Sequence, residues 1–202
     1  MSNYKLAEFS SWIPNKRKLK AVIVLVPGSN HDGRDEVNDK VWQAFATKHQ
    51  CALVGCHFTD IDPSAIEGYC DASGGSGQAL LDYLAVEGFE ALPILLYGHS
   101  AGGQFNYEFA CWKPERVAAF IVNKGGIYYT ALAPAATRQT PAMFFVGDLD
   151  EAYRVHIVKG LFWMNRVAGA IWQITIEACE HQIWRSEGLS RLFFADVLET
   201  MK

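Results

Sequence analysis

The chain has 202 residues, half of them hydrophobic and a fifth charged, with a formal net charge of −4. This length and composition predict one compact domain spanning residues 1–202, with a sizeable core. The acidic balance, with one short basic cluster at residues 16–18, gives no ground for binding nucleic acid. No apolar run approaches the length of a bilayer span, so we expect no membrane partner.

The five cysteines are an odd number and show no Cys-x-x-Cys pairing. Buried thiols in a reducing compartment are therefore more expected than a disulfide framework. Cys56 and His57 alone are too few ligands for a zinc site, so no metal is expected. The first residues lack the basic start and apolar core of a signal peptide. We therefore expect a cytoplasmic protein, or a secreted one if a signal peptide has been removed.

Short apolar runs alternate with segments of helical periodicity along almost the whole chain. Strands are predicted at residues 4–9, 19–26, 51–56, 94–98, 117–122, 141–147 and 170–178. Helices are predicted at residues 37–49, 78–86, 101–112, 152–167 and from about 189 to 198. This order predicts an α/β fold, with a mostly parallel central sheet and helices on both faces. Function is then expected in the loops after the carboxyl ends of the strands.

Residues 57–73 show no clear periodicity. A loop of that size in a compact domain is usually functional or mobile. The sequence leaves open whether this loop closes over a site as a lid.

One serine lies at the sharpest junction in this pattern. In residues 93–103, an apolar strand stops at Gly98 and a helix begins at Ala101, with Ser100 between them. Glycine at 98 and 102 relieves crowding where strand and helix meet, since neither position has a Cβ. A plain Ser/Gly turn would also fit, but the strand–turn–helix context favours a Gly-x-Ser-x-Gly nucleophile elbow. The Ala101 N–H would then be free to donate to an oxyanion.

A serine nucleophile needs a base, and His181 is the candidate among six histidines. It follows the last predicted strand, whereas His99 lies within the elbow and is expected to point away. Asp148 and Asp150 compete for the acid that orients the histidine. We favour Asp150, because Gly147 must turn the chain before a carboxylate can fold back. The other aspartate would then be a helix cap or a surface carboxylate.

With these residues in this order, the chain resembles the α/β-hydrolase fold family from about residue 19 to the C-terminus. The resemblance is carried by Pro27-Gly28-Ser29, Gly98-His99-Ser100-Ala101-Gly102-Gly103, Val146-Gly147-Asp148-Leu149-Asp150 and Glu180-His181. In that family the acid commonly follows such a glycine by three residues, which supports Asp150. The resemblance also implies a second oxyanion donor, the backbone N–H of Ser29, and no cofactor.

The chain departs from the family pattern in two places. The usual His-Gly before the oxyanion residue is Pro27-Gly28, which keeps a backbone donor. The frequent lid after the sixth strand is reduced to about residues 123–140, so the fold is expected to be minimal, with no large lid and an open site. In this outline the chain is most similar to small esterases of the polyhydroxybutyrate-depolymerase and feruloyl-esterase type.

The sequence therefore predicts a serine hydrolase that cleaves a carboxylic ester of a small or medium substrate through an acyl-enzyme intermediate. A peptidase, a thioesterase or a lyase on the same scaffold remains open, as does a non-catalytic ligand binder. The oligomeric state is not predicted. Residues expected to line the substrate pocket are His31, Phe58, Tyr69, Tyr128 and Trp184.

Overall fold

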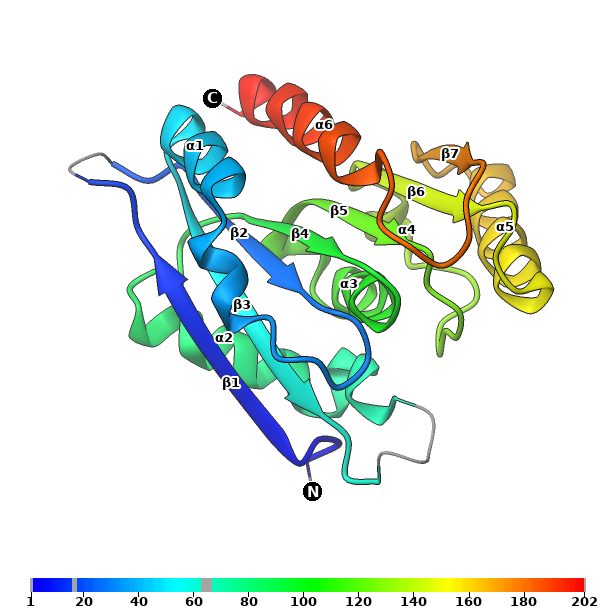
Figure 1. Cartoon of the computed structure of the whole chain (residues 1–202), viewed down its shortest axis with the longest axis horizontal. Helices are drawn as coiled ribbons and strands as arrows, with labels where there is room; N and C mark the ends of the chain where they lie inside the picture. Colours follow the sequence, from blue (N-terminus) through cyan, green and yellow to red (C-terminus); the bar gives the residue numbers. More distant parts are fainter. Residues whose placement is uncertain (1, 16–17, 63–66, 202) are drawn as a thin grey trace.

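The computed structural model describes residues 2–15, 18–62 and 67–201 and contains one seven-stranded sheet, ordered β1-β3-β2-β4-β5-β6-β7 (Figure 1). The strands are β1 (Leu6–Trp12), β2 (Ala21–Val26), β3 (Cys51–Thr59), β4 (Ile94–Gly98), β5 (Val117–Asn123), β6 (Ala142–Gly147) and β7 (Gln173–Glu177). Strand β1 runs antiparallel to β3, and every other neighbouring pair is parallel. The predicted mostly parallel sheet is confirmed.

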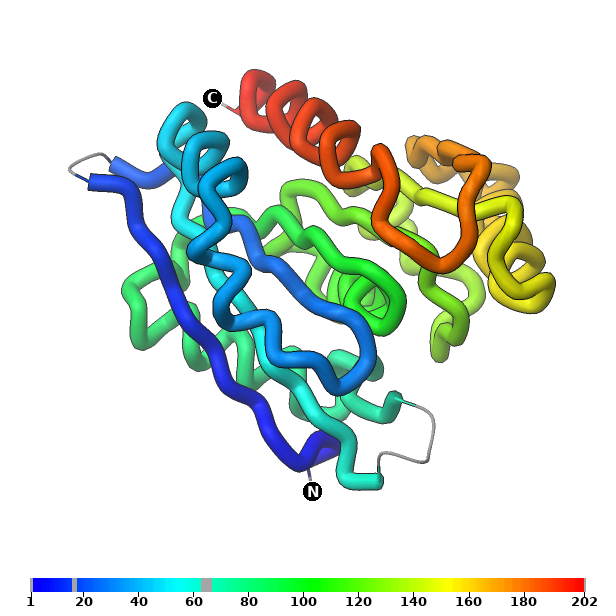
Figure 2. Tube along the Cα trace, in the orientation of Figure 1, coloured from blue at the N-terminus to red at the C-terminus, as the bar shows by residue number. Residues whose placement is uncertain are grey.

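Helices cover both faces of this sheet (Figures 1 and 2). They are α1 (Lys40–His49), α2 (Ser76–Val86), α3 (Ala101–Trp112), α4 (Ala135–Gln139), α5 (Ala152–Val167) and α6 (Ser186–Thr200). Short 3-10 helices add η1 (Arg34–Asn38), η2 (Gly68–Cys70), η3 (Ala72–Gly74) and η4 (Pro114–Arg116). Helices α1 and α6 pack on one face, and α2, α3 and α5 pack on the other.

The central strands are continuous apolar runs because both of their faces are covered. All six residues of β2 are buried, as are all five of β4. Side chains alternate between the faces: Leu96 packs on the side of α3, whereas Leu95 and Tyr97 pack on the side of α1 and α6.

Strand β3 is longer than the sequence predicts. It continues from the expected end at residue 56 through Thr59, so the first part of the predicted loop is strand. The reason is pairing with β1, which matches Leu6 with Thr59 and Glu8 with His57. Residues 63–66 and the basic pair at 16–17 lie outside the described residues, and a lid role for the 57–73 segment stays a prediction.

None of the helices in the described ranges is both long enough and apolar enough to cross a membrane.

The sheet topology places two loops side by side. Strands β2 and β4 are neighbours, but β2 leads to β3 on one side and β4 pairs with β5 on the other. In open α/β sheets the loops diverge at such a switch point and leave a crevice at the carboxyl ends of the strands. Ser29 follows β2 at this point and Ser100 follows β4.

Candidate active site

Ser100 occupies a strained turn between β4 and α3. Its backbone lies at φ 55° and ψ −123°, a region that non-glycine residues rarely adopt. The Ser100 N–H donates to the carbonyl of Asn123 at the end of β5, at 2.8 Å. A Cβ on Gly102 would lie 2.0 Å from the carbonyl oxygen of Val26. Only glycine at position 102 therefore lets α3 begin this close to β2. This close packing holds Ser100 in its strained conformation.

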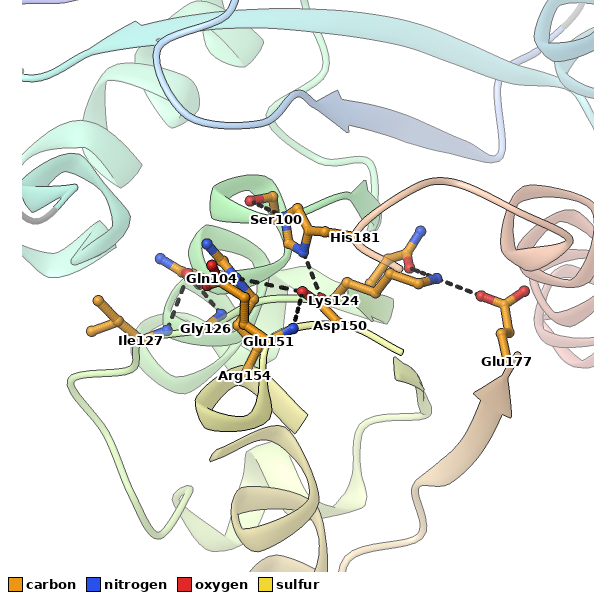
Figure 3. A network of polar contacts seen from close by, with 11 residues as sticks. Ser100, Gln104, Lys124, Gly126, Ile127, Asp150, Glu151, Arg154, Glu177 and His181 are labelled. Carbon is orange, nitrogen blue, oxygen red and sulfur yellow. Dashed lines mark hydrogen bonds and ion pairs between the residues drawn. The ribbon is translucent and has the colours of Figure 1, made fainter. Parts of the chain in front are cut away.

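Three side chains from different loops form one hydrogen-bonded chain (Figure 3). His181 Nε2 lies 2.9 Å from Ser100 Oγ, and His181 Nδ1 lies 2.7 Å from Asp150 Oδ2. The Asp150 side chain is 3% exposed and that of His181 is 29% exposed. A carboxylate on Nδ1 favours the tautomer with its proton there, which leaves the Nε2 lone pair facing the serine hydroxyl. The arrangement is suited to removing a proton from Ser100.

The loop after β6 presents Asp150 to this chain and leaves Asp148 exposed. The Asp150 N–H donates back to the Gly147 carbonyl at 3.2 Å, which closes the turn. A Cβ on Gly147 would lie 2.5 Å from the carbonyl oxygen of Cys179, so glycine allows this loop to approach the loop of His181. The second carboxylate oxygen of Asp150 accepts the Glu151 N–H at 2.7 Å.

The loop of His181 is anchored by a buried ion pair that sequence reasoning missed. Lys124 Nζ lies 2.5 Å from Glu177 Oε2, and the two side chains are 0% and 4% exposed (Figure 3). Glu177 Oε1 accepts the Arg185 N–H at 3.0 Å. Asn123 Nδ2 also donates to Ser186 Oγ at 3.0 Å. The end of β5 therefore anchors both the loop that carries His181 and the backbone of Ser100.

The loop after β2 packs against the Ser100 side chain, and the residue after Ser100 begins α3. A Cβ built on Gly28 would lie 3.8 Å from Ser100 Cβ, which brings the loop after β2 against the serine. Neither the Ser29 N–H nor the Ala101 N–H has a protein acceptor among the described residues. Ala101 is the first residue of α3, where orphan donors are normal.

The loop that carries Ser29 is held in place by its neighbour Asn30. Asn30 has a positive φ of 54° and donates its N–H to the Tyr69 hydroxyl at 3.3 Å. Its side-chain oxygen accepts the Asp60 N–H at 2.7 Å. These bonds connect the loop after β2 to the segment that follows β3.

Two residues predicted to contact substrate lie in the core instead. Phe58 is 2% exposed and its ring packs between Tyr69 and Phe105, at centroid distances of 5.6 and 5.0 Å. Tyr69 is 1% exposed. The extension of β3 turns Phe58 into the sheet interior, and the Tyr69 hydroxyl supports the Ser29 loop rather than facing solvent.

The other predicted pocket residues lie nearer the surface. His31 is exposed, and Trp184, in the loop before α6, is 54% exposed. Tyr128 is half-buried, with its ring 5.3 Å from that of Tyr107 and its hydroxyl without a partner among the described residues. Gln104 orients the chain just before it, because its side-chain oxygen accepts the N–H groups of Gly126 and Ile127 (Figure 3).

His99 does not point away as predicted. Its ring centroid lies 4.9 Å from that of His181. Burial, reinforced by the nearby His181 and Lys124, lowers the pKa of His99 to about 4. His99 is therefore neutral near pH 7 and adds no positive charge beside the candidate base.

Two cavities flank the chain of Ser100, His181 and Asp150. One of about 230 Å³ is lined by Asp150, Arg154 and His181 on the acid side. The other, of about 380 Å³, touches Gly28 and His99 on the opposite side. In the part of the chain that the structure describes, no group of three or more His, Cys, Asp or Glu side chains is arranged to hold a metal ion.

Neither a protein-family model nor a curated protein matches this sequence. Solved structures do resemble it. An esterase, PE8, has a TM-score of 0.71 at 18% identity, covering 94% of this chain and 99% of that one. A phospholipase/carboxylesterase from Dyadobacter fermentans has a TM-score of 0.69 at 14% identity, covering 99% of both chains. A poly(3-hydroxybutyrate) depolymerase, LpqC from Bordetella parapertussis, has a TM-score of 0.65 at 18% identity, covering 95% of this chain and 82% of that one.

At these identities the likeness shows the fold. The chain has the α/β-hydrolase fold, as the sequence resemblance implied.

Proposed function

We propose that this protein is a serine hydrolase that cleaves carboxylic esters through an acyl-enzyme intermediate. The observation that carries the proposal is the hydrogen-bonded chain from Ser100 through His181 to Asp150. It begins at a strained elbow and ends at a nearly buried carboxylate. This is the arrangement that acyl transfer by a serine requires.

In the first half of the reaction, Ser100 Oγ attacks the carbonyl carbon of the ester while His181 Nε2 takes the hydroxyl proton. Asp150 stabilises the imidazolium that forms and stays ionised. When the tetrahedral intermediate collapses, the bond to the alcohol oxygen breaks and His181 returns the proton to that oxygen. The alcohol leaves, and the acyl group remains on Ser100.

In the second half, His181 removes a proton from a water molecule that attacks the acyl carbon. Collapse of the second intermediate breaks the bond to Oγ, and His181 protonates the serine again. The carboxylic acid is the second product. Each cycle consumes one water and leaves the protein unchanged, so no cofactor is needed.

The N–H groups of Ser29 and Ala101 are assigned to the oxyanion in both intermediates. Both lack protein acceptors among the described residues, and the Ser29 loop lies against Ser100. Donors fixed before the reaction stabilise developing charge without reorganising, and each contributes about 3 kcal/mol when measured by deletion. The bonds from Asn30 to Tyr69 and Asp60 would hold the Ser29 donor in place.

The choice of an ester over other acyl compounds is supported by the similar structures, which are those of an esterase, a phospholipase/carboxylesterase and a poly(3-hydroxybutyrate) depolymerase. The segment between β5 and β6 contains only the short helix α4. No large insertion there would cover the substrate, which favours an open site.

A fluorophosphonate ester tests the nucleophile directly, because it forms a stable bond to an activated serine. We expect a single adduct by intact mass, located on Ser100 by peptide mapping. His181→Asn should slow labelling by about 100-fold or more, since the base contributes roughly that factor. Ser29→Ala keeps its backbone donor and serves as the matched serine control that retains labelling. An unlabelled wild type, or an adduct on another residue, would refute the assignment.

A further inference from the structure

Helix α5 exposes large apolar side chains on the side that faces away from the sheet. Its core side consists of the buried residues Val158, Leu161, Phe162 and Asn165. Its exposed apolar side chains, which we call the α5 stripe, are Tyr153, Ile157, Trp163, Met164 and Val167. Because an α-helix has 3.6 residues per turn, these two sets of positions lie on opposite sides of it. The helix is therefore apolar on two sides, although only one of them faces the core.

The α5 stripe is continuous along the helix. Gly160 lies between Ile157 and Trp163, and a Cβ there would meet nothing within 4 Å. Trp163 is 59% exposed, and Val167, the last residue of the helix, is 89% exposed. The exposed area of the stripe is on the order of 500 Å², a size at which a patch on a monomer is often functional. The helix lies at the edge of the molecule next to β7 (Figure 1).

Positive charge borders the α5 stripe. Lys159 and Arg166 lie four and three residues from Trp163, so both are its neighbours on the helix surface. Among the described residues, the ion pairs of this helix involve only Arg154, near its start. Residues 152–167 contain no aspartate or glutamate, although the whole chain has a net charge of −4. The stripe therefore combines exposed apolar side chains with positive charge that has no acidic partner on the helix.

This combination distinguishes between two kinds of partner. A second copy of the protein would present its own α5 stripe, but that helix has no acid to face Lys159 and Arg166. An anionic lipid bilayer offers an apolar interior and negatively charged headgroups together. Tryptophan and tyrosine, both present in the stripe, are enriched where proteins meet the membrane interface. Charge complementarity therefore favours a lipid surface.

We propose that α5 docks this protein on the surface of an anionic lipid membrane. The helix would lie in the plane of the interface, with the α5 stripe entering the boundary between headgroups and acyl chains. Lys159 and Arg166 would contact the negatively charged headgroups along the edge of the stripe. The sequence expectation of no membrane partner rested on the absence of a spanning run, and a helix that lies on the surface needs none.

The docking surface lies close to the proposed active site in the chain. Helix α5 begins at Ala152, two residues after Asp150. A membrane in contact with the helix would therefore bring lipid near the loop that carries this carboxylate. Docking itself does not depend on the proposed hydrolysis, because no side chain of the proposed catalytic machinery belongs to the stripe.

Sedimentation with sucrose-loaded vesicles measures the binding. The vesicles are made of ether-linked phosphatidylcholine, either alone or with about 30% ether-linked phosphatidylglycerol, which supplies the negative surface charge. Ether lipids contain no carboxylic ester, so failure of the proposed hydrolysis cannot change the result. We expect wild type to bind the anionic vesicles and to bind the neutral vesicles at least about tenfold more weakly. Raising the salt from about 0.1 M to about 0.5 M should weaken binding to the anionic vesicles, because salt screens the attraction.

The charge of the stripe is tested with Lys159→Gln/Arg166→Gln. This variant should bind anionic vesicles about tenfold more weakly than wild type, because two cations near the lipid surface are lost. Lys40→Gln/Lys48→Gln is the matched control, since it removes the same charge from exposed positions on α1. It should bind as wild type does.

The apolar part of the stripe is tested with Val167→Asp, which places a carboxylate where the helix meets the lipid. We expect binding to fall by about tenfold or more. Val86→Asp is the matched control, because Val86 is the last residue of α2 and is 83% exposed. Both variants add the same charge at the same kind of position, and Val86→Asp should retain binding.

Three results would overturn the proposal. They are failure of wild type to bind anionic vesicles, equal binding to anionic and neutral vesicles, and equal binding of Val167→Asp and wild type. A lipid-free dimer in analytical ultracentrifugation that Val167→Asp dissociates would also overturn it, because the α5 stripe would then belong to an interface with a second copy.

Discussion

Lys124 Nζ lies 2.5 Å from Glu177 Oε2, and both side chains are buried. The pair joins the end of β5 to the end of β7, and Glu177 passes the connection on to the backbone of Arg185. His181 lies on the loop between Glu177 and Arg185. The Ser100 N–H is bonded to Asn123, the residue before Lys124. One strand end therefore sets the position of the candidate base relative to the candidate nucleophile.

Lys124→Met should impair both the fold and the reaction. It leaves the buried Glu177 carboxylate without its counter-charge, which costs about 3–5 kcal/mol of unfolding free energy. The loop of His181 loses its anchor, and misplacement by about 1 Å lowers kcat by up to roughly 100-fold. KM should change little, because Lys124 touches no substrate. Urea unfolding and steady-state kinetics measure the two effects.

The double variant Lys124→Met/Glu177→Gln is the control for that experiment. The glutamine keeps an oxygen for the Arg185 N–H and removes the unpaired charge, so both stability and kcat should recover in large part. If the single variant is destabilised while its kcat equals that of wild type, the pair stabilises the fold without positioning His181.

Asp150→Asn should lower kcat by about 10³–10⁴-fold, because the amide favours the wrong tautomer of His181. Asp148→Asn, two residues away and exposed, should stay within a few-fold of wild type. Both variants are compared with the same ester under saturating conditions. Similar losses of kcat in the two variants would contradict the assignment of Asp150, rather than Asp148, as the carboxylate that orients His181.

Gly102→Ala should strongly destabilise the protein. The new methyl group would lie 2.0 Å from the Val26 carbonyl oxygen, and that oxygen belongs to backbone that cannot move aside cheaply. Overpacking of this kind costs about 1–3 kcal/mol or more. Gly160→Ala in α5 meets nothing within 4 Å and should stabilise the helix by about 0.5–1 kcal/mol. In chemical denaturation, the unfolding midpoint should therefore fall for Gly102→Ala and rise for Gly160→Ala.

The buried His99 should make the protein less stable in acid. Its pKa falls from 6.5 to about 4 on folding, so between these values the unfolded chain binds more protons than the folded one. The stabilisation that neutral His99 contributes to the folded state is fully present above pH 6.5 and is lost as the pH falls toward 4. The loss is roughly 1–2 kcal/mol after allowance for partial exposure. Unfolding curves of His99→Gln should lack this part of the pH dependence; curves that parallel wild type would contradict it.

The elements that carry strong local signals were predicted well. Helices α3 and α5 begin and end at the predicted residues, 101–112 and 152–167. The apolar runs of β2 and β4 predicted buried parallel strands, and both are confirmed. The glycines around Ser100 and the turn at Gly147 are local features as well. The structure brings Ser100, His181 and Asp150 together as the order of the strands led us to expect.

The features that sequence reasoning missed depend on contacts between distant residues. Phe58 became a core residue because β1 pairs with the end of β3, and no local pattern in residues 57–59 announces that pairing. Lys124 and Glu177 are 53 residues apart, and neither has a distinctive motif. The ring of His99 faces His181 because of how two loops meet in space. An isolated lysine directly after an apolar strand was the one local signal that could have drawn attention to Lys124.

The most direct test of the proposed function is hydrolysis of p-nitrophenyl esters, from acetate to octanoate, by wild type and Ser100→Ala. We predict that wild type hydrolyses the short members of the series. The fall in activity with acyl chain length should then report the size of the acyl pocket. Ser100→Ala should lose at least about 10³-fold in kcat, because the nucleophile and its base act as a unit. A wild type without activity, or a variant as active as wild type, would contradict the assignment of Ser100 as the nucleophile of an esterase.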